Sequence, residues 1–121
     1  LDEWNERRRN IASHYLGNLK NLGLTLPLVP EWAEPVWHLF VVRHSKRDNL
    51  QQKLNEAGIG TLIHYPIPPH LQQAYADLGY QRGSFPIAEA MADEVLSLPM
   101  GPHLDGAQRD KVIAAILGCK P

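Results

Sequence analysis

The stretch of residues 61–75, TLIHYPIPPHLQQAY, combines a strand-like run, a proline-rich bend and a helical segment. β-Branched and aromatic residues at its start predict a short β-strand over residues 61–65. Three prolines follow at once, and because proline has no backbone N–H for a sheet ladder, the strand is expected to end near Tyr65. A short helix over residues 70–78, ended by Gly79, is expected next. The stretch also holds two histidines and two tyrosines, so it is the first place to look for a site.

The segment before this stretch predicts a strand and a helix that lead into it. Residues 24–34 hold two prolines and are expected to form an extended connection. Residues 37–42 are rich in aromatic and β-branched side chains, which favours a strand. Ser45 is predicted to cap the next helix, with Asp48 three residues on in a variant of the capping box. Gly58 is expected to end that helix, so the predicted order is strand, helix, strand.

The chain is predicted to open with a long amphipathic helix over residues 1–23, with Gly23 as its stop. Its apolar stripe is formed by residues three, four and seven apart, namely Leu1, Trp4, Ile11, Tyr15, Leu19 and Leu22. Because the stripe already begins at Leu1, we expect the chain to be a fragment of a longer protein. Trp4 is expected to contact a part of that protein outside this chain.

A third sizeable helix and another strand are expected after the proline-rich stretch. Pro86 suits the first turn of a helix, where a missing N–H has no cost. The apolar stripe of this helix is predicted to consist of Ile87, Met91 and Val95. A strand is predicted over residues 96–98, after the helix ends.

The final helix carries a clear start signal. Asp105 and Gln108 have the spacing of a capping box, in which the two side chains satisfy each other's backbone N–H groups. Gly118 is the expected C-cap of this helix. Its buried face is predicted to consist of Val112, Ile113, Ile116 and Leu117.

These elements together predict an α/β (α+β) fold. We expect a two-layer sandwich in which helices cover a small, mostly antiparallel sheet of about three strands. Residues 1–121 are expected to form a single domain, with a linking helix at residues 1–23 and the sandwich at residues 36–118.

Composition limits the classes of partner. Apolar residues make up 44% and charged residues 21% of the 121 residues, and the net charge is −1, as expected for a soluble globular protein. A cytoplasmic location is expected, with which a single cysteine is compatible. The basic cluster of residues 7–9 is expected to be a solvated helix face with a Glu3 to Arg7 ion pair, so no nucleic-acid partner is predicted. No apolar run approaches the ~20 residues that cross a bilayer, so no membrane partner is predicted. Cys119 is the single cysteine and cannot form an internal disulfide.

The candidate site residues allow a structural and a functional interpretation. His64 and Tyr65 are adjacent on a predicted strand, so we expect them to point to opposite sides, one into the core and one outward. The rigid proline bend after them favours presentation of the outer side chain to a ligand. No metal site is predicted, because His64 and His70 lack helical ligand spacing and no cysteine supports them. The residues alone therefore leave open a free-standing small α/β module that binds a metabolite or a partner.

A resemblance to a known family narrows this choice. The motif is Gly58-Ile59-Gly60-Thr61, then Ile63-His64-Tyr65-Pro66-x-Pro68-x-His70-x-Gln72-x-Ala74-Tyr75. It closely resembles the C-terminal segment of the DegT/DnrJ-type aminotransferases, pyridoxal-phosphate enzymes that transaminate nucleotide-linked keto-sugars. Other pieces of the chain follow in the order found in that family, including Phe85-Pro86-x-Ala88-Glu89 and Leu96-Ser97-Leu98-Pro99. The resemblance covers nearly the whole chain, and its strength lies in the ordered set of pieces.

The resemblance implies that the chain is the small C-terminal domain of a fold-type I aminotransferase. The cofactor, pyridoxal 5′-phosphate, would be held by a missing large domain, which would also supply the lysine of the Schiff base. None of the lysines of this chain fits that role, since all are expected on polar helix faces or ends: Lys20, Lys46, Lys53, Lys111 and Lys120. The isolated chain is therefore expected to hold no cofactor and to be inactive.

The resemblance also implies roles for particular residues. His64, Tyr65 and His70 are expected to bind and orient the nucleotide-sugar without forming covalent bonds to it. Arg82 is a weaker candidate for a phosphate contact, and Arg43 for a structural ion pair. A homodimer is expected, with an amino-acid donor such as glutamate. A related aminotransferase with a non-sugar substrate remains an alternative.

Overall fold

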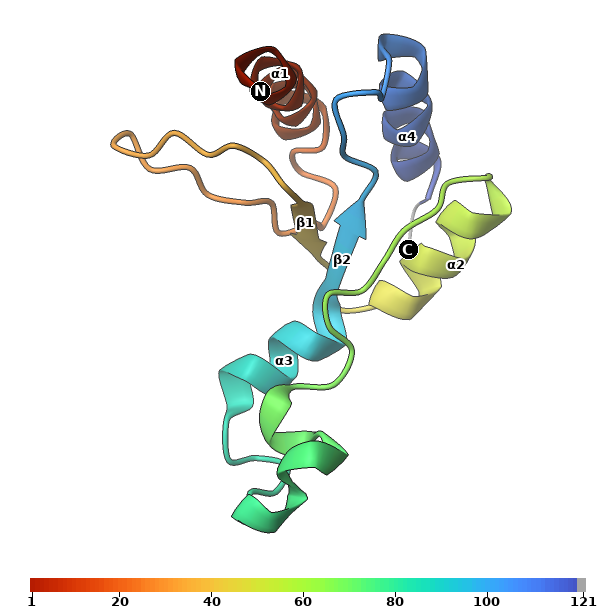
Figure 1. Ribbon diagram of the computed structural model, residues 1–121. Helices are drawn as coiled ribbons and strands as arrows, with labels where there is room; N and C mark the ends of the chain where they lie inside the picture. The colour runs from red at the N-terminus through yellow and green to blue at the C-terminus, as the bar shows by residue number, and fades with distance from the viewer. Residues whose placement is uncertain (120–121) are drawn as a thin grey trace.

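The computed structural model describes residues 1–119 (Figure 1). Four of the five lysines considered above, Lys20, Lys46, Lys53 and Lys111, lie among the described residues. Lys120 lies outside them. The elements in chain order are α1 (Asp2–Asn18), β1 (Phe40–Arg43), α2 (Arg47–Glu56), the 3₁₀ helices η1 (Pro69–Leu71) and η2 (Gln73–Leu78), α3 (Pro86–Glu94), β2 (Val95–Leu98) and α4 (Gly106–Gly118). Figure 1 shows α1, α2 and α4 gathered around one end of the sheet, while η1, η2 and α3 form a separate lobe at its other end.

The sheet confirms the predicted fold class with fewer strands. Among the described residues, β1 and β2 form one antiparallel pair, in which Phe40 lies opposite Leu98. The expected third strand at residues 61–65 is wrong, because only Leu62 pairs with β2, through a single bridge to Ser97. The chain then turns away ahead of the proline-rich bend, whose residues cannot extend a ladder. The predicted strand after the third helix is confirmed as β2.

The first strand begins later than residues 37–42 predict. Trp37 has a positive φ of 53°, which breaks the extended conformation before β1 starts at Phe40. The guanidinium group of Arg8 donates hydrogen bonds to the carbonyl oxygens of Trp37 and His38, at 3.0 and 3.2 Å. This approach to β1 is therefore held by α1 and not by the sheet.

Two predicted helix boundaries are wrong. The first helix ends at Asn18 and not at Gly23, which follows in a left-handed conformation with φ of 75°. Ser45 does not cap α2, since Lys46 occupies the N-cap position and no side-chain cap bond forms there. The backbone N–H of Lys46 instead donates to Nδ1 of His44, at 2.9 Å.

Three other boundaries are confirmed. Gly58 has φ of 81°, and the N–H of Ile59 donates to the carbonyl oxygen of Leu54 at 2.8 Å, as in a Schellman motif. Gly79 ends η2 in the left-handed conformation. The side chain of Asp105 accepts from the N–H of Gln108, and the reciprocal bond completes the capping box of α4. The predicted C-cap of α4 is wrong by one residue, because the helix runs through Gly118 and Cys119 is its C-cap residue.

The core lies between α1, the sheet, α2 and α4. Its largest fully buried side chains are Tyr15, Phe40, Leu19, Leu54, Leu96 and Val42. The rings of Tyr15 and Phe40 meet edge to face, with centroids 5.0 Å apart. Tyr15 also donates its hydroxyl to the carbonyl oxygen of Pro99, at 2.7 Å. The predicted buried face of α4 is correct except at Leu117, which is 47% exposed.

The predicted apolar stripe of α3 is wrong. Pro86 does occupy the first turn, but Ile87 is 76% exposed and Met91 is 44% exposed. The buried residues of this helix are Glu89 and Ala92. The helix buries a carboxylate because it packs against polar backbone of its own lobe, as described below.

Two arginines join α2 and β1 to the end of α3. Arg47 is buried, and its Nη1 donates to the carbonyl oxygens of Ala92 and Val95, at 2.9 and 3.0 Å. The expected structural pairing of Arg43 is confirmed, since its guanidinium lies 2.7 Å from the carboxylate of Glu94. The predicted ion pair of Glu3 and Arg7 also forms.

None of the helices within residues 1–119 combines the length and the apolar character needed to cross a membrane.

Candidate functional site

A small groove lies beside the bend that follows Leu62. Its volume is about 210 Å³, and one wall is the segment of residues 64–72 while the other is α3 with the start of β2. Its lining is mostly apolar and consists of His64, Tyr65, Ile67, Pro68, Pro69, Gln72, Ala88, Met91, Ala92 and Val95. A concave apolar surface with a few polar groups is typical of small-molecule sites.

His64 is held from the sheet side. Its Nδ1 lies 2.8 Å from the hydroxyl oxygen of Ser97, a residue of β2 that is 5% exposed. The same serine exchanges two backbone hydrogen bonds with Leu62, at 2.8 and 3.3 Å. Because Ser97 engages Nδ1, Nε2 is the ring nitrogen of His64 that is left for a ligand. The contribution of Ser97 was not predicted from the sequence.

Tyr65 borders the same groove. The expectation that His64 and Tyr65 point to opposite sides is wrong, because residues 63–65 do not form a strand and both side chains line the groove. Their rings meet edge to face, with centroids 5.5 Å apart. Tyr65 is 71% exposed, so its hydroxyl is open to a ligand or to another part of the protein.

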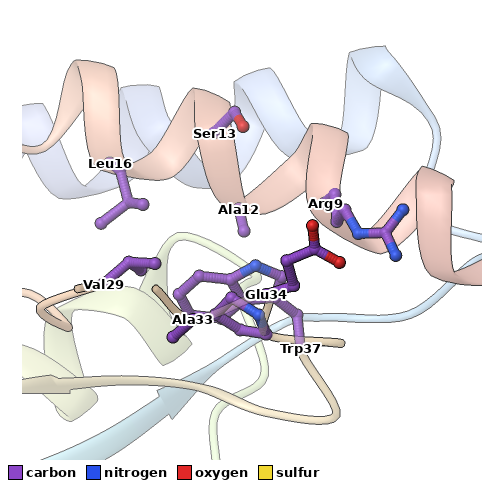
Figure 2. A pocket seen from close by; sticks show the side chains of 9 residues that line it. Arg9, Ala12, Ser13, Leu16, Val29, Ala33, Glu34 and Trp37 are labelled. Atoms are coloured by element: carbon purple, nitrogen blue, oxygen red, sulfur yellow. The ribbon is translucent and has the colours of Figure 1, made fainter. Parts of the chain in front are cut away.

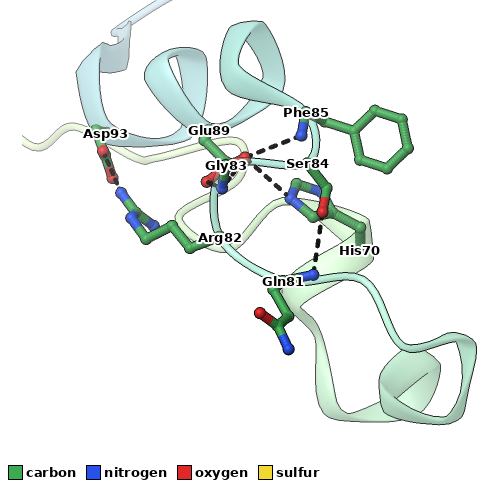
Figure 3. Close-up of polar contacts among 8 residues, drawn as sticks. All are labelled: His70, Gln81, Arg82, Gly83, Ser84, Phe85, Glu89 and Asp93. Carbon is green, nitrogen blue, oxygen red and sulfur yellow. Dashed lines mark hydrogen bonds and ion pairs between the residues drawn. The ribbon is translucent and has the colours of Figure 1, made fainter.

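His70 occupies a different position from the one expected for a ligand contact. It is 9% exposed and does not belong to the groove lining. Its Nε2 lies 3.3 Å from a carboxylate oxygen of Glu89, and its ring packs against Phe85 with centroids 4.9 Å apart (Figure 3). The structure therefore places His70 inside the lobe and not on its surface.

Glu89 is the centre of a polar cluster in this lobe (Figure 3). Its carboxylate accepts the backbone N–H of Gly83 at 2.7 Å and that of Phe85 at 3.1 Å. The Gly83 N–H, with help from the Phe85 N–H and His70, lowers the pKa of this carboxyl against the opposing effect of burial. The position of Glu89 in the first turn of α3, where carboxylates meet free amides, is a signal that could have identified it.

Arg82 lies on the surface of the same loop. Its guanidinium pairs with the carboxylate of Asp93 at 2.7 Å, and both side chains are more than half exposed (Figure 3). It does not line the groove. The structure thus separates the four predicted site residues: His64 and Tyr65 lie together at the groove, His70 lies behind it and Arg82 lies outside it.

The groove offers no lysine for a Schiff base among the residues that line it. None of the four lysines described, Lys20, Lys46, Lys53 and Lys111, lines the groove. A covalent link to pyridoxal phosphate needs a lysine within reach of the substrate. Among residues 1–119, no group of three or more histidine, cysteine or acidic side chains could hold a metal ion.

A second hollow shares no lining residue with this groove. Its volume is about 420 Å³, and it runs between α1 and the connection that leads to β1. Figure 2 shows Leu16 and Val29 at one end of it, Arg9 and Glu34 at the other, and the ring of Trp37 below. Arg9 is engaged by Glu6 at 2.8 Å.

A two-stranded antiparallel sheet, helices around one end of it and a groove-bearing lobe at the other define a small α/β domain. Residues 1–117 match the DegT/DnrJ/EryC1/StrS aminotransferase family, and the chain belongs to this family.

Named relatives agree with this assignment. The chain is 56% identical over 117 residues to the erythromycin biosynthesis sensory transduction protein EryC1 of Saccharopolyspora erythraea, covering 96% of this chain and 32% of the relative. It is 50% identical to a dTDP-3-amino-3,4,6-trideoxy-alpha-D-glucose transaminase of Streptomyces venezuelae, with 96% and 31% covered. Among solved structures, S. venezuelae DesV in complex with a ketimine intermediate superposes with a TM-score of 0.92 at 49% identity, over 95% of this chain and 31% of that one. The chain therefore spans about a third of the length of these relatives.

Proposed function

We propose that this chain is the small C-terminal domain, over residues 1–121, of a pyridoxal-phosphate-dependent aminotransferase that transfers an amino group to a nucleotide-linked keto-sugar. The family match and the transaminase from S. venezuelae support the reaction class and the type of substrate. The share of the relatives that is covered supports a larger protein with a further domain.

The observation that carries the proposal is the groove with His64 and Tyr65 on one wall. His64 presents Nε2 because Ser97 holds Nδ1, and Tyr65 presents a phenol hydroxyl beside it. Imidazole and phenol groups can donate or accept hydrogen bonds, as recognition of sugar hydroxyls requires. In the proposal these two residues orient the nucleotide-sugar and leave proton transfer to the missing lysine.

The cofactor is assigned to the large domain. Pyridoxal phosphate supplies the electron sink for transamination when it is bound there. The residues of this chain close the substrate side of the site and provide no covalent anchor. The isolated chain is therefore proposed to be inactive, and an aldimine absorbance band with turnover by the chain alone would overturn this.

The exposed apolar side chains support a contact with that further domain. Leu28 is 90% exposed, Trp32 is 87% exposed and Ile87 is 76% exposed. Trp4, the residue expected to make such a contact, is 49% exposed and packs edge to face on His103. In the proposal, the further domain covers these side chains. A homodimer, glutamate as amino donor and a cytoplasmic location belong to the same proposal.

The test uses the full-length protein that carries this domain. His64→Ala and Tyr65→Phe are compared with the parent for the Michaelis constant of a dTDP-keto-sugar and for turnover, with Tyr75→Phe as a control outside the groove lining. Loss of one hydrogen bond to the substrate is expected to raise the Michaelis constant about fivefold to tenfold with turnover little changed. Unchanged constants in both groove variants would remove these residues from the substrate site.

Two alternatives make different predictions. A free-standing metabolite-binding or interaction module is favoured by the second hollow beside α1, which is larger than the groove. It predicts little binding of an apolar dye, whereas a domain severed from a larger protein exposes apolar surface and binds the dye. If the enzyme is an aminotransferase with a non-sugar substrate, the full-length protein should turn over other keto acceptors and should not turn over the keto-sugar.

A further inference from the structure

The two walls of the groove are joined behind it by a buried pair of side chains. His70 follows Pro69, which lines one wall, and Glu89 follows Ala88, which lines the other. Neither His70 nor Glu89 lines the groove, yet their side chains meet at 3.3 Å. The pair thus connects the proline-rich bend to α3 at the level of the groove.

We infer that Glu89 and His70 are positioning residues that set the separation of the groove walls and the place of the loop formed by residues 81–85. The inference rests on the proposed function, since it concerns the same groove. It gives His70 a role that acts through the fold, in place of the direct contact with substrate expected from the sequence.

Burial makes this connection strong. Both side chains are 7% exposed, and a buried carboxylate is stable only when several donors face it. Nε2 of His70 has no hydrogen-bond partner of standard geometry within the described residues, so Glu89 is the group that compensates it. A carboxylate only accepts hydrogen bonds, so the imidazole faces it as a donor in this arrangement. Removing Glu89 leaves Nε2 of His70 buried without this polar neighbour, and removing His70 takes one polar partner from a carboxylate that keeps the N–H groups of Gly83 and Phe85.

The same carboxylate also holds the loop. Its bonds from the N–H groups of Gly83 and Phe85 fix the backbone between η2 and α3, and Figure 3 shows the contacts of this carboxylate with Gly83, Phe85 and His70. The N–H of Gln81 donates to the hydroxyl of Ser84 at 3.1 Å, which closes the loop locally. The ring of Phe85 packs on His70, so the bend, the loop and α3 meet at one point.

A substrate contact by His70 fits the structure less well. The ring would have to leave a buried site and give up its contacts with Glu89 and Phe85 before it could reach a ligand in the groove. A positioning role needs no such movement. It also accounts for a glutamate on the buried face of α3, where the sequence pattern predicts apolar side chains.

The experiment uses the full-length protein and two measurements on each variant. Glu89→Gln removes the charge of the carboxylate, and His70→Ala removes the imidazole ring. His70→Gln keeps a side-chain N–H donor that can face Glu89. Glu56→Gln on α2 is the matched control, because it makes the same chemical change on an exposed surface. Hydrogen exchange of the peptide that spans residues 81–85 reports on the loop, and steady-state kinetics with the keto-sugar report on the groove.

For Glu89→Gln and His70→Ala, exchange at residues 81–85 is expected to accelerate about tenfold or more while the core elements stay protected. The acceptor of the Gly83 and Phe85 N–H groups loses its charge in the first variant and its His70 neighbour in the second. The Michaelis constant is expected to rise about fivefold with turnover little changed, since substrate placement and not chemistry is affected. His70→Gln is expected to recover part of both effects, and Glu56→Gln to match the parent.

Three results would overturn the inference. They are unchanged local exchange in both Glu89→Gln and His70→Ala, faster local exchange with an unchanged Michaelis constant, and a general loss of protection throughout the domain. If Glu89→Gln does not fold, the comparison of His70→Ala with His70→Gln decides the question. Failure of the proposed function is seen separately, because it leaves His64→Ala without effect on the keto-sugar and the full-length protein without keto-sugar turnover.

Discussion

The hydroxyl group of Ser97 lies 2.8 Å from Nδ1 of His64, and it joins the core strand β2 to the first polar side chain of the groove. The backbone of Ser97 also pairs with Leu62. Three hydrogen bonds from one buried serine therefore fix the direction in which the chain leaves the sheet. The imidazole is presented by the rigid part of the domain, although it lies in a segment without regular structure.

Ser97→Ala is expected to release the imidazole of His64 while leaving the fold intact. The loss of one side-chain hydrogen bond should lower the free energy of unfolding by about 1 kcal/mol. The nitrogen chemical shifts of the His64 ring should change as Nδ1 loses its fixed partner, which is measurable by NMR. Ser13→Ala, at an exposed position of α1, serves as the control and should alter neither quantity. Unchanged His64 shifts in Ser97→Ala would show that the serine does not orient the ring.

Features decided by neighbours in sequence were predictable. The C-terminal end of α2 and the start of α4 depend on Gly58 and on the Asp105 to Gln108 capping box, which are local hydrogen-bonded motifs. The strand β2 was also predicted, since a short apolar run follows the helix that Pro86 opens. The family resemblance rests on an ordered set of such local pieces, and the match over residues 1–117 confirms it.

Features decided by distant residues were not predictable in this way. The start of β1 depends on Arg8 of α1, whose guanidinium donates hydrogen bonds to the carbonyl oxygens of Trp37 and His38. The buried face of α3 depends on Glu89, whose partners come from the bend and from the preceding loop. The sequence pattern predicts a strand before Phe40 and an apolar buried face for α3. Both predictions fail because the pattern contains no information about which polar groups will meet across the fold.

The stability of the protein is expected to fall in alkaline solution because of Tyr15. Burial, partly offset by the positive charge of Arg109, raises the pKa of this hydroxyl well above its ordinary value of 10.0. The folded state therefore favours the protonated form, and this contribution to stability is complete below pH 10 and is lost as the pH rises toward the higher folded pKa. Tyr15→Phe should remove this part of the alkaline dependence.

The same substitution has a separate effect at neutral pH. Without the hydroxyl, the carbonyl oxygen of Pro99 loses its donor, and a loss of about 1–3 kcal/mol is expected. Urea unfolding at a series of pH values measures both effects, with Tyr75→Phe at a half-exposed position as the control. An alkaline stability profile of Tyr15→Phe parallel to that of the parent would contradict the assignment to Tyr15.

An opposite pH dependence is expected from Glu89. The N–H of Gly83 above all lowers the pKa of its carboxyl from 4.5, so the folded state favours the charged form. The resulting stabilisation is present above pH 4.5 and is lost as the pH falls through the lower folded pKa. Glu89→Gln should therefore flatten the acid branch of the stability curve, whereas Glu56→Gln should leave it as in the parent. An acid branch that is the same in both variants would exclude this contribution.

Arg47→Met is expected to destabilise the junction of α3 and β2. The guanidinium of Arg47 supplies the donor for the carbonyl oxygens of Ala92 and Val95 in a buried position, and methionine fills similar space without a donor. Two unpaired buried carbonyl groups should lower the free energy of unfolding by about 2–5 kcal/mol, measured by urea unfolding. Arg9→Met removes only an exposed pair with Glu6 and should change stability by about 1 kcal/mol or less. Equal losses in the two variants would mean that these carbonyl groups find water in place of Arg47, and that the junction is not held by its side chain.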